Sequence, residues 1–303
     1  MSGVLAFGEA ECLSVADAGG KGASLARMTS LGLPVPPGYV IPSGALAASL
    51  PDGGDELRAL ARARDAEAAQ TLIRTVELDP ALREAVLGAY ATLGDGREDV
   101  PVAVRSSACA EDSEAASFAG QQETYLHVRG PDDLRARIRD CWASFFSERA
   151  LFYREQKGSL DDLGMAVVVQ RMVEADVAGV LFTCDPVRKR HDRMVIEAVL
   201  GLGEAVVSGE VTPDHYVLKR DGTVKRAQVH TQPYAIVSDP EGGVVERELS
   251  PEVGGARKVD AEVLAELARI GDDLERRLGV PQDIEWAVQS GEIFVLQARP
   301  VTA

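Results

Sequence analysis

The 303-residue chain carries 48 acidic and 32 basic side chains, which gives a formal charge of −16. Its length allows one large or two modest hydrophobic cores. The negative charge repels the phosphate backbone of nucleic acids and anionic membrane surfaces, so we expect neither as a partner. A nucleotide is compatible with this charge, because its site needs only a few local cations and Mg²⁺.

The cysteines and the lack of targeting segments indicate a cytoplasmic protein. The N-terminal residues lack the basic and apolar regions of a signal peptide. No window approaches 18 consecutive apolar residues, which excludes a membrane-spanning helix. The cysteines lie far apart without a C-x-x-C spacing, as expected of reduced, mostly buried thiols. They are Cys12, Cys109, Cys141 and Cys184.

The first half of the chain is predicted to be rich in helix. A glycine-rich loop at 17–22 opens a helix that ends near Gly32, because glycine is favoured just past a helix C-terminus. The region 52–93 has helical periodicity, and within it Asp79 and Pro80 match the N-cap and first helical positions. Further elements are expected at 39–41, 100–104 and 124–128 as strands, and at 131–156 as one long amphipathic helix.

The second half is predicted to be rich in strand. Apolar, β-branched runs bounded by Gly, Asp and Pro occur at 164–173, 179–184, 193–199 and 214–219. One helix is expected over 263–278, with Asp260 as its N-cap and Gly279 at its end. The change of character near residue 164 divides the chain into two predicted domains, 1–163 and 164–303.

The segment from Arg105 to Tyr125 is the strongest candidate for a phosphate-binding loop. It follows the apolar run 102–104 and contains no large apolar side chain before Phe118. Small residues let the backbone approach a ligand and direct N–H groups at anionic oxygens. The Arg105 guanidinium is a permanently charged fork suited to phosphate. From these residues alone, a mobile polar loop with a surface arginine is an equally good interpretation.

Residues 283–299 are predicted to form a β-hairpin with one apolar and one polar face, because side chains alternate between the two faces of a strand. A three-residue turn at 290–292 would produce these faces, and a slip of one residue would mix them, so burial favours this register. The expected pairs are Gln289 with Ile293, Glu285 with Gln297, and Asp283 with Arg299. The apolar face would hold Ile284, Trp286, Val288, Phe294, Leu296 and Ala298.

The polar face of this hairpin is a candidate magnesium site. Glu285 and Gln297 would place a carboxylate and an amide oxygen side by side, and such oxygens suit Mg²⁺. Arg299 beside them would supply a cation for a phosphate. A solvent-facing strand with one cross-strand ion pair is the alternative interpretation.

Three other patterns do not support a site. Residues 18–24 resemble a P-loop superficially, but the first glycine of that motif would fall at Val15. Residues 201–206 contain only two of the three glycines of the dinucleotide fingerprint. The histidines lie in no triad or metal-ligand spacing, so we interpret them as surface or structural residues. They are His127, His191, His215 and His230.

Taken together, six separate blocks in order resemble the nucleotide-binding domain of the phosphoenolpyruvate synthase and pyruvate, phosphate dikinase family, which includes rifampin phosphotransferases. The resemblance covers nearly the whole chain. The blocks are Gly19–Lys21 with Pro34–Gly38, Val104–Ser107 with Ser117–Thr124, Val168–Val173, Gly179–Thr183, Glu197–Glu204, and Asp283–Trp286 with Gln297–Pro300.

The resemblance implies an α+β ATP-grasp fold, in which ATP binds in the cleft between two lobes. By the same resemblance, Lys21 and Arg105 would grip phosphates, and Gly120 and Thr124 would line the loop above them. Gln170 and the backbone near Met172 would hold adenine. Glu285 and Gln297 would bind Mg²⁺, and Arg299 would stabilise charge on the transferring group. Glu197 lies in a matching block, but a structural role is equally compatible with its position.

The family resemblance also bears on partners. Full-length members continue into a swivelling domain with a phospho-accepting histidine and then a substrate domain, whereas this sequence stops at Val301–Ala303. We therefore expect an enzyme that cleaves ATP to AMP and passes a pyrophosphoryl group to a histidine on a separate partner, then to a small molecule. The alternatives are a stand-alone kinase or ligase that releases ADP, and a non-catalytic ATP-binding module.

Overall fold

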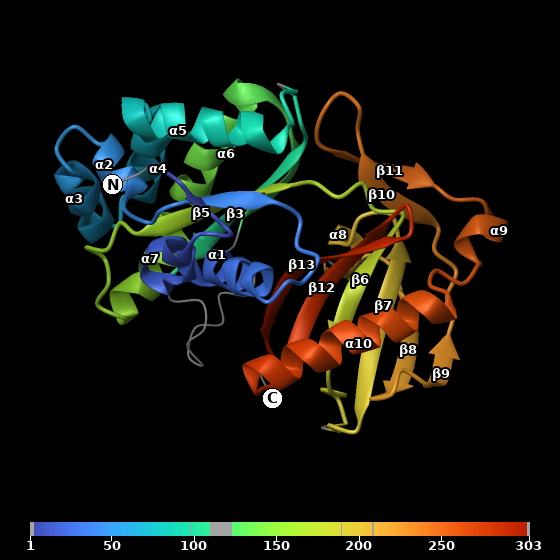
Figure 1. Ribbon diagram of the computed structural model, residues 1–303. Helices are drawn as coiled ribbons and strands as arrows, with labels where there is room; N and C mark the ends of the chain where they lie inside the picture. The colour runs from blue at the N-terminus through green and yellow to red at the C-terminus, as the bar shows by residue number, and fades with distance from the viewer. Residues whose placement is uncertain (1–2, 98, 110–122, 189, 208, 302–303) are drawn as a thin grey trace. The chain divides into compact units, whose positions relative to one another are not determined.

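The computed structural model describes residues 3–97, 99–109, 123–188, 190–207 and 209–301. The chain divides into two compact units. The first comprises Met1–Ser30 and Pro37–Met172, and the second comprises Leu31–Pro36 and Val173–Ala303. Each unit combines helices with a β-sheet (Figure 1), so the chain is of the mixed α+β class, as predicted. Within the described ranges, no helix combines the length and the hydropathy needed to cross a membrane.

The first unit is built on a five-stranded antiparallel sheet with the order β1–β2–β5–β3–β4. The strand that comes last in the sequence, β5, therefore lies between β2 and β3. The strands are β1 (Leu5–Ala6), β2 (Gly38–Ile41), β3 (Val102–Ala108), β4 (Thr124–Val128) and β5 (Met165–Arg171).

Helices pack on both faces of this sheet. On one face lies α1, where a Cβ at Gly22 would come within 2.9 Å of Val40 Cγ2. On the other face, Val104 and Val169 join the main core together with Trp142 of α6. The helical elements are η1 (Ala10–Leu13), α1 (Val15–Ser30), α2 (Ala45–Ser49), α3 (Asp55–Ala63), α4 (Ala66–Thr75), α5 (Pro80–Leu93), α6 (Gly130–Ser144) and α7 (Glu148–Gln156).

The predicted N-cap of α5 is confirmed, because the Asp79 side chain accepts hydrogen bonds from the N–H groups of Ala81 and Leu82, with Pro80 at the first helical position. The predicted single helix over 131–156 is wrong. The chain leaves α6 after Ser144, and Ser147 begins α7 by accepting a hydrogen bond from Ala150 N. A serine that satisfies a free backbone N–H favours a new helix start over a continued helix.

The division of the chain falls later than the sequence suggests. We expected a boundary near residue 164, whereas the two units separate between Met172 and Val173. The reason is β5, whose residues pair with Gly38–Ile41 on one side and with Val102–Ala108 on the other. An apolar run that looks like the start of the strand-rich half is therefore the central strand of the first sheet.

The second unit is built on a six-stranded antiparallel sheet with the order β13–β12–β6–β7–β8–β9. Its strands are β6 (Val177–Phe182), β7 (Arg193–Leu200), β8 (Asp214–Lys219), β9 (Val224–Gln228), β12 (Gln282–Gln289) and β13 (Glu292–Pro300). A separate two-stranded sheet and two short helices complete the unit: β10 (Tyr234–Ser238), β11 (Val244–Glu248), α8 (Glu204–Val207) and α9 (Pro251–Gly254).

One face of the six-stranded sheet is covered by α10 (Ala261–Leu278) (Figure 1). This helix begins at the predicted Asp260 cap, whose side chain accepts a hydrogen bond from Val263 N, and ends at Gly279, whose φ is 77°. Gly271 lets it approach the sheet, because a Cβ there would come within 2.8 Å of Leu181 Cδ2. Leu181 lies opposite Ile284 in the sheet, and both are fully buried.

The short segment Leu31–Pro36 belongs to the second unit, although the chain on both sides of it belongs to the first. Within the second unit, Val295 N of β13 donates a hydrogen bond of 2.9 Å to Pro34 O. This proline-rich segment is therefore attached to β13, the strand at the edge of the sheet.

A buried ion pair joins β8 to the segment before α10. Lys258 Nζ lies 3.1 Å from Asp214 Oδ1, and both side chains are fully buried. The Asp214 carboxylate also accepts hydrogen bonds from Tyr216 Oη at 2.7 Å and from His230 N at 3.0 Å. Lys258 Nζ donates to Gly254 O at 2.8 Å. The polar groups of this pair are thus satisfied by hydrogen bonds as well as by each other.

Replacement of Lys258 by Met should destabilise the protein strongly, because it leaves the Asp214 carboxylate buried without its counter-ion. Breaking a buried pair from one side typically costs about 3–5 kcal/mol. Urea unfolding followed by circular dichroism would measure the loss. The exposed Lys225→Met is the matched control and should change stability by less than about 0.5 kcal/mol. Equal effects of the two substitutions would contradict this role for the pair.

Candidate nucleotide-binding residues

In the first unit, the glycine-rich start of α1 packs closely against β3. Gly19 has a φ of 68°, and a Cβ there would lie 2.2 Å from Ser107 O, so only glycine fits. Ser107 Oγ donates a hydrogen bond to Ala18 O at 2.9 Å and accepts one from Gly22 N at 3.2 Å. These contacts hold the residues around Lys21 beside the strand that carries Arg105.

Lys21 is buried, with 6% of its surface exposed, and its Nζ donates a hydrogen bond of 3.0 Å to Ser106 O. The ammonium group therefore contacts β3 at Ser106, the residue that follows Arg105 in the sequence. A buried ammonium retains its charge only where polar or anionic groups surround it. The position of Lys21 is compatible with the predicted contact to a phosphate.

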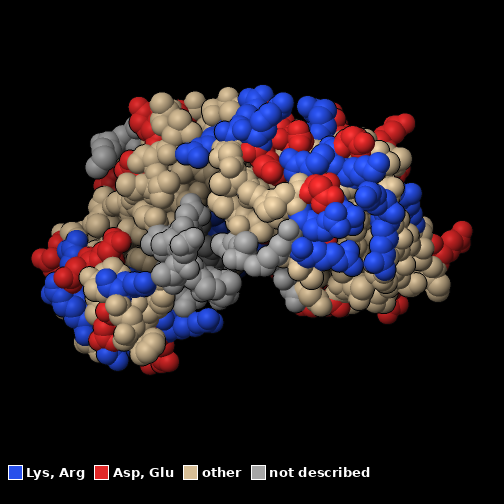
Figure 2. Space-filling model, turned by 90° about the horizontal axis from the view of Figure 1, so that it is seen from below, with Lys and Arg blue, Asp and Glu red and all other residues tan. Residues whose placement is uncertain are grey.

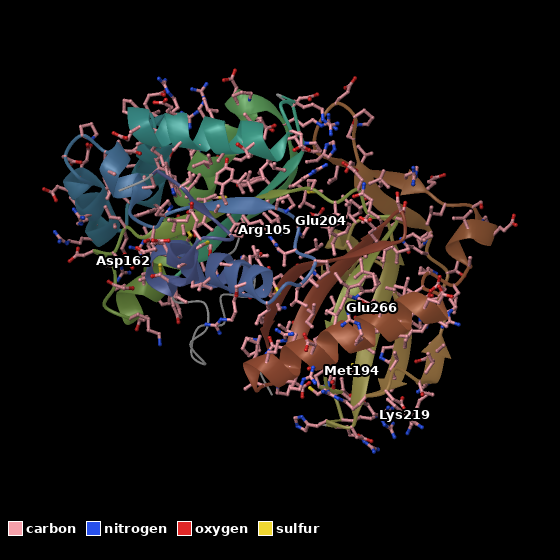
Figure 3. All side chains as sticks on the ribbon, viewed as in Figure 1. Arg105, Asp162, Met194, Glu204, Lys219 and Glu266 are labelled. Atoms are coloured by element: carbon pink, nitrogen blue, oxygen red, sulfur yellow. The ribbon has the colours of Figure 1, made fainter. Side chains whose placement is uncertain are left out.

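Arg105, Thr124 and Gln170 lie on one face of the first sheet. Arg105 is directly opposite Thr124 on β4 and Val168 on β5, and Gln170 is opposite Ala103. Because directly paired residues and alternate residues of a strand share a face, these three side chains lie on the same side as Ser107, which contacts α1. Figure 3 labels Arg105 in this sheet. Gln170 is buried, and its neighbour Met172 donates its N–H to Pro101 O at 3.0 Å. Gly120 lies outside the described residues.

In the second unit, the hairpin brings together the predicted polar pairs. Glu285 is opposite Gln297, and Asp283 is opposite Arg299, so these two pairs are confirmed. The turn end is different from our prediction, because Gln289 pairs with Glu292 instead of Ile293. The turn has two residues, Ser290 and Gly291, with φ values of 52° and 83°. Two positive φ values are typical of the tight turns that match the twist of a hairpin.

A one-residue bulge reconciles the short turn with the predicted pairs. Trp286 is opposite Val295, whereas its neighbour Glu285 is opposite Gln297, so Leu296 is the extra residue on β13. The predicted assignment of Leu296 and Phe294 to the face of Trp286 is therefore wrong. Both side chains pack in a small cluster with Ala287.

Asp283 orients Arg299 at the polar end of the hairpin. Arg299 Nε donates a hydrogen bond of 2.8 Å to Asp283 Oδ2. The Asp283 side chain is 11% exposed and that of Arg299 is 60% exposed, so the carboxylate is fixed inside while most of the arginine is accessible. Burial raises the pKa of Asp283, and the nearby Arg299 guanidinium offsets part of that rise.

Glu285 and Gln297 lie beside each other on the face of the sheet opposite α10. Gln297 is 8% exposed and Glu285 is half-buried. Together they offer two hard oxygen ligands, and Mg²⁺ commonly takes its other ligands from water and substrate phosphates. Among the described residues, no group of three or more His, Cys, Asp or Glu side chains could hold a metal ion.

Two further polar residues, Glu197 and His215, lie in the row of directly opposite residues that contains Glu285. The residue opposite Glu285 on β6 is Val180, which is opposite Glu197 on β7, and Glu197 is opposite His215 on β8. Directly opposite residues share a face. The polar row therefore extends beyond the hairpin, and strand alternation around Glu197 was the signal that could have indicated it.

Comparison with known proteins identifies the family of the chain. Residues 15–303 match the family described as pyruvate phosphate dikinase, AMP/ATP-binding domain, and the chain belongs to that family. A probable phosphoenolpyruvate synthase of Methanocaldococcus jannaschii is 39% identical over 94% of this chain and 25% of that protein. A rifampicin phosphotransferase of Bacillus cereus is 36% identical over 99% of this chain and 36% of its own length.

Relatives with several different names share this domain. A prodigiosin synthesizing transferase of Serratia marcescens is 38% identical over 94% of this chain and 31% of its own length. This chain thus spans between about a quarter and about a third of the length of these three relatives. The proteins that share this domain have different names, so membership identifies an AMP/ATP-binding domain without identifying the phosphoryl acceptor.

The raised pKa of Asp283 predicts the pH dependence of its contribution to stability. A carboxyl group with a higher pKa in the folded chain than in the unfolded chain stabilises the fold when protonated, and that contribution is lost as the pH rises through the folded-state pKa. The stability of the wild type relative to Asp283→Asn should therefore fall as the pH rises above the ordinary aspartate value of 3.8. Urea unfolding at a series of pH values would measure this difference.

The matched control is Asp221→Asn. Hydrogen bonds from Thr223 lower the pKa of Asp221, so its stabilising contribution should be lost as the pH falls through the folded-state value, which is the opposite sign. If both substitutions gave the same direction of change with pH, the account of Asp283 would be incorrect.

Proposed function

We propose that the two units are the lobes of an ATP-grasp fold and that Mg-ATP binds in a cleft between them. The observation that carries this proposal is the polar end of the hairpin, where Glu285 and Gln297 are side by side and Asp283 orients Arg299. An oxygen pair for Mg²⁺ next to an accessible guanidinium matches the charge that must be neutralised on a triphosphate. The family membership supports the nucleotide independently.

Residues of the first unit would complete the site. Lys21 and Arg105 would bind phosphate oxygens, and Gly120 and Thr124 would line the loop next to them. The burial of Gln170 and its place on the face of Arg105 support a contact with the adenine, together with the backbone near Met172. This arrangement would place cations along the triphosphate and an amide at the base.

The hairpin residues would act on the transferring group. Mg²⁺ held by Glu285 and Gln297 would neutralise charge on the phosphates. Arg299 would stabilise the negative charge that spreads over the transferring group, and its hydrogen bond to Asp283 fixes it before the substrate binds. Preorganised charge of this kind needs little rearrangement in the transition state, which is the main source of catalysis in phosphoryl transfer.

The proposed reaction cleaves ATP to AMP and transfers the β,γ-pyrophosphoryl group to a histidine on a separate partner protein. Water would then cleave the terminal phosphoryl group from that histidine as inorganic phosphate, and the remaining phosphoryl group would pass to a small molecule. The relatives support this class of reaction, because those named above include a probable phosphoenolpyruvate synthase and a rifampicin phosphotransferase. Incubation with Mg-ATP and a histidine-bearing partner, followed by nucleotide chromatography, tests it. Partner-dependent AMP is expected, and ADP made by the chain alone would favour a direct kinase or ligase.

Replacement of Arg299 by Ala should reduce turnover by at least about 100-fold, because loss of one transition-state contact costs about 3–4 kcal/mol in comparable sites. Nucleotide binding should change by less than about threefold, since the adenine contacts lie in the other unit. The partner-dependent AMP assay and calorimetry measure these quantities. Arg247→Ala, at an exposed position on β11, is the control. Near-normal turnover of the Arg299 variant would contradict the assigned role.

Replacement of Glu285 by Ala should weaken the binding of Mg-ATP more than that of metal-free ATP, because its carboxylate is proposed to act through Mg²⁺. We expect a loss of about tenfold or more for Mg-ATP and less than about threefold for ATP in EDTA. Isothermal titration calorimetry measures both. Glu292→Ala, at the exposed turn end of the same hairpin, is the control. Equal losses with and without metal would refute a magnesium site.

A further inference from the structure

Two neighbouring connections of the second unit are basic in an otherwise acidic chain. Residues 185–194 and 217–226 contain eight Lys or Arg against three Asp, a formal charge of +5 in a chain of −16. They are adjacent because β7 pairs with β8, with Arg193 opposite Lys219. Figure 2 shows lysine and arginine side chains gathered on the right of the view, on the surface of this unit. The basic cluster consists of Arg188, Arg190, Arg193, Lys219, Lys225 and Arg226.

The local acidic residues offset only part of the cluster. Asp192 accepts two hydrogen bonds of 2.9 Å from Arg190 and lies 3.6 Å from Arg193. Arg220 is paired with Asp272 at 2.8 Å and with Glu275 at 2.9 Å, whereas Lys219, Lys225 and Arg226 are exposed and form no ion pair among the described residues. Three cations are therefore available to an acidic partner.

An apolar side chain projects from the same surface. Val187 is 89% exposed at the tip of the connection between β6 and β7. The connection is held by a pair of backbone hydrogen bonds between Asp185 and Arg190, of 2.9 and 3.1 Å, and by Asp185 Oδ1, which accepts from Arg188 N. An exposed apolar group near cations is a combination that also occurs in protein–protein interfaces, where apolar residues are rimmed by polar ones.

The basic cluster lies at the same end of the sheet as Arg299. Arg299, Asp283, Phe182, Val195, Val217 and Arg226 are opposite one another in successive strands. They therefore form one row on the face that carries Glu285. Neighbouring strands lie about 4.8 Å apart, and β6 is two strands and β9 five strands away from β13. The backbone of Arg299 is therefore about 10 Å from Phe182, the last residue of β6, and about 24 Å from Arg226. One partner of ordinary interface size can cover both places.

We propose that the basic cluster and Val187 form a docking surface for an acidic face of the protein that carries the phosphoryl-accepting histidine. This proposal rests on the proposed function, because it assigns the place where that partner binds. A chain of charge −16 repels an acidic partner at long range, and a local positive surface beside Arg299 attracts and orients it. The partner would then present its histidine next to the transferring group.

Protection of a sheet edge and binding of a nucleic acid would each account for only part of the cluster. Lys225 occupies a bulge in β9, which is an edge strand, and edge lysines prevent strand association. That role does not apply to the arginines between β6 and β7. A nucleic acid would be attracted by the cations, but its binding would not explain the exposed Val187 between β6 and β7. Protein docking accounts for the charge, the valine and the position beside Arg299.

The test measures binding of a defined probe to charge-reversed chains. The probe is the part of the Bacillus cereus rifampicin phosphotransferase that lies outside its match to this chain, produced as a separate protein. The variant is Lys219→Glu, Lys225→Glu and Arg226→Glu combined. The control carries Arg27→Glu, Arg83→Glu and Arg247→Glu, which change the net charge equally at exposed sites elsewhere.

We expect the cluster variant to raise the dissociation constant of the probe by at least about tenfold at about 50 mM salt, and the control by less than about twofold. The difference should shrink at about 500 mM salt, where charges are screened beyond about 4 Å. Val187→Asn should weaken binding about threefold at both salt concentrations, because its contribution is apolar. Biolayer interferometry measures all of these values.

Three results would overturn the docking surface. They are no binding of the probe to the wild type, equal binding to the wild type and the cluster variant, and tighter binding of a single-stranded DNA oligonucleotide than of the probe through the same residues. Calorimetry with Mg-ATP on the chain alone reports on the proposed function separately. Normal Mg-ATP binding without docking refutes the docking surface alone, whereas docking without Mg-ATP binding refutes the nucleotide site alone.

Discussion

The register between β12 and β13 is the constraint on which the candidate chemistry depends. It places the Glu285 carboxylate next to the Gln297 amide and the Arg299 guanidinium next to Asp283. A shift of one residue would move both partners on β13 to the face covered by α10. The ion pair between Asp283 and Arg299 stabilises one end of this register. At the other end, the two-residue turn pairs Gln289 with Glu292. The extra residue at the bulge, Leu296, shifts the register by one so that Glu285 still pairs with Gln297.

One face of the second sheet packs against α10, and the other carries the candidate polar residues. Leu181 and Ile284 lie on the face of α10 and are fully buried, which gives the strands a firm support. The opposite face carries Glu285, Glu197 and Arg299 along with apolar residues. Because polar residues on a supported strand have few ways to move, the sheet can hold their relative positions more strictly than a loop could.

Much of this arrangement could be predicted from residue patterns. Strand alternation alone indicated that Glu285 and Gln297 are neighbours, and the cap at Asp79 followed from its side-chain chemistry. The turn at Ser290 and Gly291 was missed, since serine at a positive φ carries no strong sequence signal. The row that includes Glu197 was missed because it depends on strand order, which is decided by contacts between distant segments. The nucleotide itself was inferred from family resemblance, not from these patterns.

The path of the chain between the two units affects how the protein can be divided. Leu31–Pro36 joins the second unit while its flanking segments join the first, and Pro34 O accepts a hydrogen bond from Val295. A cut after Met172 would therefore leave Leu31–Pro36 on the first fragment, and β13 of the second fragment would lose its hydrogen bond to Pro34. An isolated second unit would therefore need residues 31–36 joined to residues 173–303 through a new linker.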